Sequence, residues 1–317
     1  MHAVFLDWES VDKQDLDQRC LLDLPVSWQF HASTPAAQLA ARVTGQQIVV
    51  SNKVVLDAAT IQAARELRLI CVAATGTNNI DLSAATARQI PVCNVRGYAT
   101  ASVVQHVFML MLNLLRQQPA YQRAIAAGRW QRSEHFCLLE NTIEELGGKT
   151  LGIVGLGELG QAVARMAEHF GMHVLVAQRH NGEPQPGRLA LEELLPRVDV
   201  LSLHCPLTEQ TRNLIGVHEL ALMKPSAILI NTARGGIVDE QALLAALVEG
   251  RLAGAGMDVL HSEPPQEGNL LLEHALPNLI ITPHIAWASR QARQRLIEGI
   301  AQNIQAYLNG QPRNLVA

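Results

Sequence analysis

The sequence predicts an α/β protein with two doubly wound parallel-sheet domains. Short runs of Val, Ile and Leu alternate with longer stretches of helical period along the whole chain, a pattern typical of parallel sheets covered by helices. The 317 residues suffice for two domains of ordinary size, each with its own core. Hydrophobic residues make up 48% of the chain, so we expect large buried cores.

The first third of the chain is predicted to form short strands with helices between them. We expect helices at residues 35–43 and 57–66, and strands at residues 3–6, 26–30, 48–50, 69–72 and 91–94. A helix with few charges follows at residues 102–116, and it is apolar on almost all sides. Such a helix must be buried between two bodies, so we expect it at a domain or subunit boundary.

A second series of strands and helices begins at Thr150 and predicts a complete dinucleotide-binding sheet. Its six expected strands are residues 151–154, 173–177, 200–203, 228–231, 254–258 and 279–282. One last amphipathic helix covers residues 289–309. Because the first domain lacks a closing element, we expect this helix to return to it. The predicted domains are residues 1–98 together with 288–317, and residues 99–287.

Charge, cysteine usage and hydropathy narrow the class of protein. The net charge of −4 provides no general attraction for nucleic acid or anionic lipid. The five cysteines are scattered without a C-x-x-C pair, which favours free thiols in a reducing compartment. The apolar stretch at residues 99–115 contains Gln105, His106 and Asn113, which argues against a membrane span. We expect a cytoplasmic protein that binds neither nucleic acid nor membranes.

A glycine-rich segment follows the first strand of the second series. Gly155-Leu156-Gly157-Glu158-Leu159-Gly160 fits the dinucleotide fingerprint G-x-G-x-x-G between a strand and a helix. Gly155 allows a tight turn, Gly157 lets the backbone approach a pyrophosphate, and Gly160 lets the helix pack closely. The N-terminus of that helix supplies N–H donors and partial positive charge. A plain strand-to-helix turn is the alternative interpretation.

The next strand of this series ends without the acidic residue that holds the ribose in NAD-preferring domains. Gln178 and Arg179 occupy that place, and His180 follows them. Arg179, aided by His180, can pair with a 2′-phosphate through charge-assisted hydrogen bonds. We therefore expect NADP(H) or NAD(H), leaning to NADP(H). The alternative is a solvent-facing Arg179, with NADH held through its pyrophosphate and nicotinamide.

Three polar residues near strand ends form the candidate catalytic set. Arg234 precedes two glycines, Glu263 precedes two prolines, and His284 follows the last expected strand. A guanidinium can bridge the carboxylate and the carbonyl of a 2-keto acid. An imidazole can donate a proton in reduction and accept one in oxidation, and a carboxylate partner orients the ring. A surface arginine, a solvated loop acid and a structural histidine are the alternative interpretations.

Over its whole length the sequence resembles the D-isomer-specific 2-hydroxyacid dehydrogenases, above all the glycerate dehydrogenase/hydroxypyruvate reductase branch. Besides the glycine fingerprint, the matching segments are Ala74-Thr75-Gly76-Thr77-Asn78-Asn79-Ile80-Asp81, Thr100-Ala101-Ser102-Val103, His204-Cys205-Pro206-Leu207-Thr208, Asn231-Thr232-Ala233-Arg234-Gly235, Gly256-Met257-Asp258-Val259, Glu263-Pro264-Pro265 and Pro283-His284-Ile285-Ala286-Trp287. The resemblance implies a Rossmann nucleotide domain flanked by a flavodoxin-like, discontinuous substrate domain. It implies NAD(P)H-dependent reduction of a small 2-keto acid, such as hydroxypyruvate or glyoxylate, to the D-2-hydroxy acid.

The resemblance also implies further contacts with substrate and cofactor. Thr75, Gly76 and Thr77 would cradle the substrate carboxylate, and Trp287 would wall the substrate pocket. Asp258 would bind the nicotinamide carboxamide. The remaining implied cofactor contacts are Glu158, Leu159, His204, Cys205, Pro206, Thr232 and Ala233. A tight turn at Gly76, a helix cap at Asp258 and a core position for Trp287 are the alternatives.

Two other functions stay open. A short-form phosphoglycerate dehydrogenase would share the fold and the catalytic residues, and a dinucleotide-sensing, corepressor-like protein would bind without turnover. Formate dehydrogenases pair their histidine with an amide, and Glu263 argues against that activity. The histidines form no set with metal-ligand spacing, so we expect no metal site. The apolar helix at residues 102–116 suggests a homodimer built on the nucleotide domain.

Overall fold

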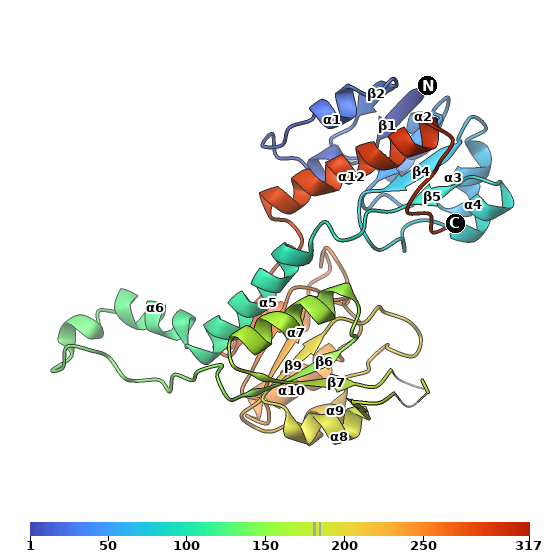
Figure 1. Ribbon diagram of the computed structural model, residues 1–317. Helices are drawn as coiled ribbons and strands as arrows, with labels where there is room; N and C mark the ends of the chain where they lie inside the picture. Colours follow the sequence, from blue (N-terminus) through green and yellow to red (C-terminus); the bar gives the residue numbers. More distant parts are fainter. Residues whose placement is uncertain (180–181, 184) are drawn as a thin grey trace. The chain divides into compact units, whose positions relative to one another are not determined.

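The computed structural model describes residues 1–179, 182–183 and 185–317 (Figure 1). Two compact units make up the chain: unit 1 is Met1–Ala99 with Trp287–Ala317, and unit 2 is Thr100–Ala286. Each unit contains one parallel sheet covered by helices, which confirms the predicted α/β fold class.

Unit 1, all of whose residues are described, contains a five-stranded parallel sheet. Its strands are β1 (His2–Phe5), β2 (Ser27–Phe30), β3 (Ile48–Ser51), β4 (Leu69–Val72) and β5 (Val92–Cys93). They lie in the order β2-β1-β3-β4-β5, which is the flavodoxin-like arrangement. The strands β3 and β4 are buried on both faces, and this is why they read as uninterrupted apolar runs.

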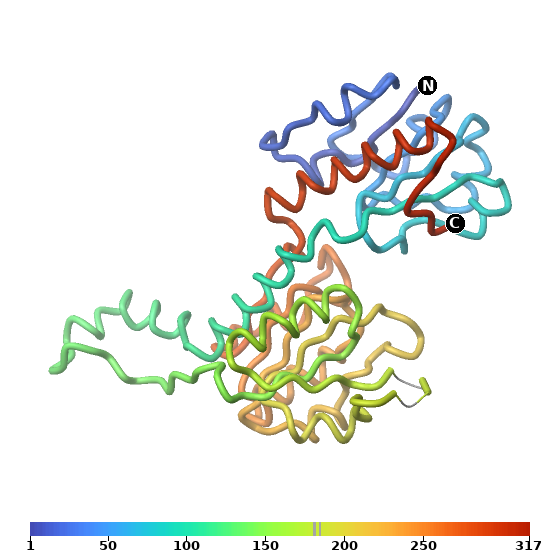
Figure 2. Tube along the Cα trace, in the orientation of Figure 1, coloured from blue at the N-terminus to red at the C-terminus, as the bar shows by residue number. Residues whose placement is uncertain are grey.

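The helices of unit 1 cover this sheet. They are α1 (Arg19–Leu22), α2 (Ala36–Val43), α3 (Ala58–Ala63), α4 (Leu82–Ala87) and α12 (Arg290–Leu308), with a 3-10 turn η1 (Trp8–Ser10). The C-terminal helix α12 packs against β4 and α1, as the red segment of Figure 2 shows. Its buried face, which includes Leu296, Ile300 and Ile304, joins one core with Phe5 and Val50. The last segment of the chain therefore completes the first sheet's core.

Unit 2 contains a larger parallel sheet, with seven strands in the described residues. They are β6 (Thr150–Val154), β7 (His173–Ala177), β8 (Arg188–Leu189), β9 (Val200–Leu203), β10 (Ile228–Asn231), β11 (Gly254–Met257) and β12 (Leu279–Ile281). The strands lie in the order β12-β11-β10-β9-β6-β7-β8 and are all parallel. The strand order, but not the strand direction, reverses between β6 and β9, as in Rossmann domains. The expectation of six strands was wrong by one, because the two residues of β8 are too few to produce a periodic pattern.

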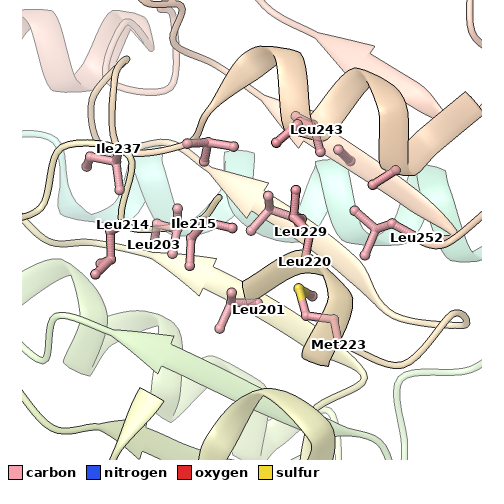
Figure 3. Close-up of a cluster of buried hydrophobic side chains, with 14 of the residues drawn as sticks. Leu201, Leu203, Leu214, Ile215, Leu220, Met223, Leu229, Ile237, Leu243 and Leu252 are labelled. Carbon is pink, nitrogen blue, oxygen red and sulfur yellow. The ribbon is translucent and has the colours of Figure 1, made fainter. Parts of the chain in front are cut away.

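The helices of unit 2 are α5 (Thr100–Leu115), α6 (Gln118–Ala126), α7 (Glu158–His169), α8 (Leu191–Leu194), α9 (Val217–Leu222), α10 (Glu240–Val248) and α11 (Leu270–Glu273), with 3-10 turns η2 (Trp130–Arg132) and η3 (Leu195–Arg197). Buried leucines and isoleucines from β9, β10, α9 and α10 fill one face of the sheet (Figure 3). These packed side chains hold the strand ends rigidly in place.

The apolar helix α5 packs on unit 2 itself. It lies against β10, β11 and α7, and Gly256 lets it approach the sheet, since a Cβ there would lie 3.0 Å from the Leu110 Cβ. Val107, Leu110 and Met111 are fully buried in this way. The apolar character of α5 therefore follows from packing within its own unit and does not require a second subunit.

Candidate active site

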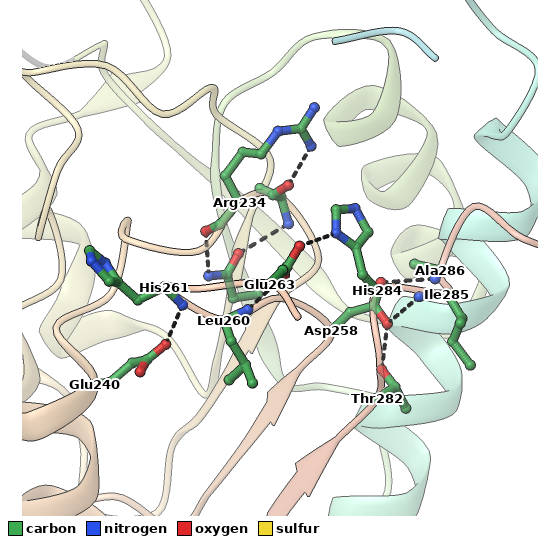
Figure 4. Close-up of polar contacts among 12 residues, drawn as sticks. Arg234, Glu240, Asp258, Leu260, His261, Glu263, Thr282, His284, Ile285 and Ala286 are labelled. Atoms are coloured by element: carbon green, nitrogen blue, oxygen red, sulfur yellow. Dashed lines mark hydrogen bonds and ion pairs between the residues drawn. The ribbon is translucent and has the colours of Figure 1, made fainter. Parts of the chain in front are cut away.

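Arg234, Glu263 and His284 follow three neighbouring strands of the unit 2 sheet. Arg234 follows β10, Glu263 lies in the loop after β11, and His284 lies in the loop after β12. Because the strands are parallel, their carboxyl ends meet at the same edge of the sheet (Figure 4). The structure thus brings the loops of three residues that are separated by as many as fifty positions in the sequence to one edge of the sheet.

His284 and Glu263 form a short side-chain hydrogen bond. The Nδ1 atom of His284 lies 2.5 Å from Oε2 of Glu263, and the two side chains are 25% and 32% exposed. The other carboxylate oxygen of Glu263 accepts a hydrogen bond from the backbone N–H of Leu260 at 2.8 Å. Glu263 is therefore held by its own loop and in turn orients the imidazole, with Nε2 on the side of the ring away from Glu263.

The backbone at His284 adopts a conformation that is unusual for a residue with a side chain. Its φ of 54° lies in the left-handed region, a conformation that is energetically unfavourable for residues other than glycine. The His284 N–H donates to the Asp258 carbonyl at 2.8 Å, and the Asp258 carboxylate accepts from the N–H groups of Ile285 and Ala286 at 2.9 and 2.8 Å. These bonds impose the turn, and it directs the imidazole toward Glu263 (Figure 4).

The loop that carries Arg234 is fixed by Asn231. The Asn231 side chain accepts from the Ala233 N–H at 3.0 Å and donates to the Arg234 carbonyl at 3.0 Å. Gly235 then passes so close to the Glu263 loop that a Cβ would lie 1.7 Å from the Leu260 carbonyl oxygen. Gly235 therefore permits close contact between the Arg234 loop and the Glu263 loop.

The glycine fingerprint forms a cradle that fits a pyrophosphate. Gly155 has a φ of 97°, and a Cβ there would lie 2.7 Å from backbone atoms of His204 and Cys205. A Cβ on Gly160 would lie 2.1 Å from the Gly155 carbonyl oxygen, whereas nothing in the described part of the chain lies within 4 Å of a Cβ on Gly157. The backbone at Gly157 is thus open to a ligand at the N-terminus of α7, which begins at Glu158.

A cleft of about 800 Å³ adjoins this cradle. Its lining includes Gly155, Gln178 and three arginines, Arg179, Arg188 and Arg212. The Gln178 amide donates to the Gly182 carbonyl at 2.8 Å. Gln178, which stands where NAD-preferring domains have an acidic residue, thus stabilises its own loop. His180 lies outside the described residues. Our sequence reasoning missed Arg188 and Arg212, which come from β8 and from a loop remote in sequence.

His204 and Thr232 follow the paired strands β9 and β10. Burial lowers the pKa of His204 to about 4, so the ring is neutral at pH 7, and its Nε2 lies 2.9 Å from the Ser202 hydroxyl. The His204 Nδ1 and the Thr232 hydroxyl are buried without a hydrogen-bond partner among the described residues. Burial also raises the pKa of the Cys205 thiol to about 11, which suits a structural turn better than a nucleophile.

The candidate residues of unit 1 lie after β4 and at the start of the returning segment. The Thr75 hydroxyl donates to the Val95 carbonyl at 2.9 Å, and Asn94 donates to the Thr75 carbonyl at 2.6 Å, so the turn at Thr75, Gly76 and Thr77 is tied down. Trp287 packs edge-on against Tyr98, with ring centroids 6.3 Å apart. These four residues belong to unit 1, whereas Arg234, Glu263 and His284 belong to unit 2.

Two features are absent from the part of the chain that the structure describes, a metal site and a membrane-spanning helix. No group of three or more His, Cys, Asp and Glu side chains is arranged to hold a metal ion. None of the described helices is long and apolar enough to cross a membrane.

Comparisons with known proteins agree with this geometry. The family model "D-isomer specific 2-hydroxyacid dehydrogenase, NAD binding domain" matches residues 108–286, which are most of unit 2. The chain is 44% identical over 315 residues to the glycerate dehydrogenase of Methylorubrum extorquens, covering 99% of this chain and 98% of that protein.

Two solved structures extend the agreement to the whole fold. An acyclic imino acid reductase in complex with NADPH and D-Arg matches with a TM-score of 0.88 and 26% identity over 100% of both chains. A D-lactate dehydrogenase from Aquifex aeolicus, complexed with NAD and lactic acid, matches with a TM-score of 0.82 and 28% identity over 99% of this chain and 98% of that one. This chain belongs to the D-isomer specific 2-hydroxyacid dehydrogenases, a family of enzymes that use a nicotinamide dinucleotide.

Proposed function

We propose that this enzyme reduces a small 2-keto acid, such as hydroxypyruvate or glyoxylate, to the D-2-hydroxy acid with NAD(P)H. The observation that carries the proposal is the 2.5 Å contact between His284 Nδ1 and Glu263 Oε2. These residues lie in the loops after β12 and β11, beside the loop after β10 that carries Arg234. The similarity to a glycerate dehydrogenase supports a small substrate, because oxidation of glycerate at its second carbon yields hydroxypyruvate.

Each catalytic residue has a separate task in this reaction. The Arg234 guanidinium binds the carboxylate and the carbonyl oxygen of the substrate, which orients and polarises the carbonyl. His284 donates the proton on Nε2 to that oxygen, and Glu263 stabilises the imidazolium and fixes the ring. The bound nicotinamide supplies the hydride that the carbonyl carbon accepts. In the reverse direction His284 accepts the hydroxyl proton.

Unit 1 supplies the remaining substrate contacts in this proposal. The backbone N–H groups at Thr75, Gly76 and Thr77 bind the substrate carboxylate, since their turn is already held by Val95 and Asn94. Trp287 is the residue that we propose to limit the size of the substrate. Residues 1–98 with 288–317 thus form the substrate domain, and residues 99–287 form the nucleotide domain.

In this proposal the carboxyl edge of the unit 2 sheet would hold the cofactor. Gly155, Gly157 and the first N–H groups of α7, at Glu158 and Leu159, hold the pyrophosphate. The turns at His204-Cys205-Pro206 and Thr232-Ala233 contact the nicotinamide half. Asp258 has no exposed side-chain surface. Its carboxylate is already hydrogen-bonded to the turn at residues 282–286, which carries His284. We therefore assign it an indirect role in place of the expected direct contact with the carboxamide.

The 2′-phosphate of NADPH has a candidate site in the 800 Å³ cleft. Arg179, Arg188 and Arg212 line the cleft, and Gln178 replaces the carboxylate that would repel a phosphate. We expect kcat/KM to be higher with NADPH than with NADH. A tenfold or greater preference for NADH would refute this part of the proposal, and the arginines would then be solvent-facing.

A second copy of the chain is the proposed partner. The segment after α6 exposes large apolar side chains, with Phe136 93% and Leu139 79% exposed. Figure 1 draws α6 and this segment beyond the end of α5, away from the sheet of unit 2. Such side chains are typical of a protein contact. Light scattering at micromolar concentration should show a dimer, and replacing both residues with Ser should yield a monomer.

The five free cysteines suit the reducing cytoplasm, where we place the enzyme.

The decisive experiment is an assay of NADH and NADPH oxidation at 340 nm with a panel of 2-keto acids. Hydroxypyruvate and glyoxylate should give the highest kcat/KM. A preference for 3-phosphohydroxypyruvate would favour a short-form phosphoglycerate dehydrogenase. Binding of the dinucleotide without turnover of any keto acid would favour a dinucleotide sensor and would overturn the proposal.

A further inference from the structure

A histidine of the apolar helix α5 contacts the turn that carries His284. The Nε2 atom of His106 lies 2.9 Å from the Thr282 hydroxyl and 3.4 Å from Oδ1 of Asp258. The Thr282 hydroxyl lies 2.5 Å from the same carboxylate oxygen. His106 is the one ionisable side chain in the apolar sequence of α5, and this is the signal in the sequence that indicates a special role.

The directions of these hydrogen bonds follow from the number of protons available. The Asp258 carboxylate accepts from the Ile285 and Ala286 N–H groups, so it acts as an acceptor. At 2.5 Å from Oδ1, the Thr282 hydroxyl must place its single proton between the two oxygens, which would otherwise repel. The Thr282 oxygen can then only accept from His106. The His106 ring must therefore carry its proton on Nε2.

Burial agrees with a neutral His106 that has this single tautomer. The side chain is 10% exposed, and that of Asp258 is 0% exposed. Burial lowers the pKa of His106, and the nearby Asp258 carboxylate opposes this effect without cancelling it. The ring is thus a neutral donor at pH 7, and it adds no net charge near the proposed proton donor.

The same face of α5 also contacts the C-terminal end of the turn at residues 282–286. Ser102 lies one helical turn before His106, and its hydroxyl donates to the Ala286 carbonyl at 2.7 Å. His106 acts through Thr282 and Asp258, and Ser102 acts directly. Together they fasten the turn at residues 282–286, in which His284 has its strained left-handed backbone.

We propose that His106 is a positioning residue for catalysis: its hydrogen bond to Thr282 orients the Asp258 carboxylate, which holds the His284 turn opposite Glu263. The inference rests on the proposed function, in which His284 is the proton donor. His106 does not touch the substrate. Its loss should therefore impair proton transfer more than substrate binding.

Steady-state kinetics of paired variants test this role. His106→Leu removes the donor and should lower kcat about 10- to 100-fold, with KM for the keto acid changed less than about twofold. His106→Gln places an amide N–H near the position of Nε2 and should recover most of kcat. The exposed neighbour on the same helix, in the variant Gln105→Leu, should behave as wild type. Equal kcat in the Leu and Gln variants would overturn the inference.

Variants at Thr282 guard against a folding defect in the helix. Thr282→Val should lower kcat as His106→Leu does, and Thr282→Ser should retain it. The double variant His106→Leu/Thr282→Val should be no slower than the slower single variant, because both changes break one relay. Multiplied losses in the double variant would show two independent effects and would contradict the relay.

A spectroscopic test does not depend on turnover. Long-range ¹H–¹⁵N correlation spectra of the 12 histidine rings should contain a neutral Nε2–H ring that disappears in His106→Gln. In His106→Leu the resonances of the His284 ring should shift. An Nδ1–H or charged His106 at pH 7 would overturn the inference. If wild-type protein reduces no keto acid, the proposed function fails while this test still stands; normal turnover in His106→Leu removes only the inference.

Discussion

The carboxyl edge of the unit 2 sheet has two halves that are built differently. After β6, β7 and β9 the chain forms a cradle from glycines and backbone, beside a cleft lined by arginines. After β10, β11 and β12 it presents charged side chains that are hydrogen-bonded to one another and to neighbouring loops. Both halves belong to one sheet, so strand geometry does not cause the difference.

The two halves are built for different tasks. The pyrophosphate of a dinucleotide is bound by main-chain N–H groups, and a ligand can reach these groups only where side chains are missing. Proton transfer needs a side chain at a fixed place, and fixing it requires bonds from several loops. Each half should therefore fail in its own way when it is altered.

The largest effect should come from His284→Ala, in the half built from side chains. The proton donor disappears, so kcat should fall by about 10²- to 10⁴-fold. Dissociation constants for NADH and NADPH, measured by fluorescence titration, should stay within about threefold of wild type. Near-wild-type turnover in this variant would refute the assignment of His284.

Gly235→Ala should separate the two loops of the same half. The added methyl group would meet the Leu260 carbonyl at 1.7 Å, so the Arg234 and Glu263 loops must move apart. A displacement of about 1 Å can cost about 100-fold in rate, and we expect a loss of that order in kcat/KM. The control is Gly147→Ala, where a Cβ would have only an ordinary contact at 3.6 Å. Unchanged kcat/KM in Gly235→Ala would show that the loop contact is dispensable.

Gly157→Val should impair only the half built from backbone. A Cβ at this position has no neighbour within 4 Å among the described residues, so the melting temperature should hardly change. It would occupy the space where the pyrophosphate approaches, and the dissociation constant for the dinucleotide should rise about tenfold or more. The kcat at saturating cofactor should stay close to wild type. A loss of kcat with unchanged cofactor affinity would contradict the division between the halves.

The last prediction concerns the pH dependence of stability and His204, which follows β9 at the border of the two halves. Its pKa is about 4 in the folded protein and about 6.5 in an unfolded chain, so the unfolded state binds the extra proton first. Stability is therefore lost as pH falls from about 6.5 to 4, by roughly 3 kcal/mol from this group. The drop in melting temperature between pH 7 and pH 5 should be smaller in His204→Gln than in wild type. An equal drop in both proteins would show that His204 does not titrate in this way.

The strands were predicted well because each has a strong local signal. Buried parallel strands such as β3 and β4 are continuous apolar runs, and their predicted bounds differ from the observed ones by one residue at most. The glycine cradle was also visible in the sequence, since its spacing follows from the local demands of a strand, a turn and a helix. The strand β8 was missed because pairing with β7 defines it, and its own two residues do not.

Contacts between distant segments explain what the sequence reasoning missed. Arg188 and Arg212 line the cleft only because β8 and the loop after β9 approach the same glycine turn. The glycine after Arg234 serves a contact with Leu260, twenty-five positions away. Neither relation leaves a periodic or spacing signal, because nothing in the local chain requires it.

The fold class, the glycine cradle and the candidates Arg234, Glu263 and His284 could all be predicted from the amino-acid sequence. Those features depend on residue type and short-range spacing, which the chain carries in any conformation. Only the tertiary structure decided that Glu263 faces His284, and that His106 supports the same turn through Thr282 and Asp258. Hydrogen bonds of this kind are set by the order of parallel strands in the sheet, and that order brings remote segments to a common edge.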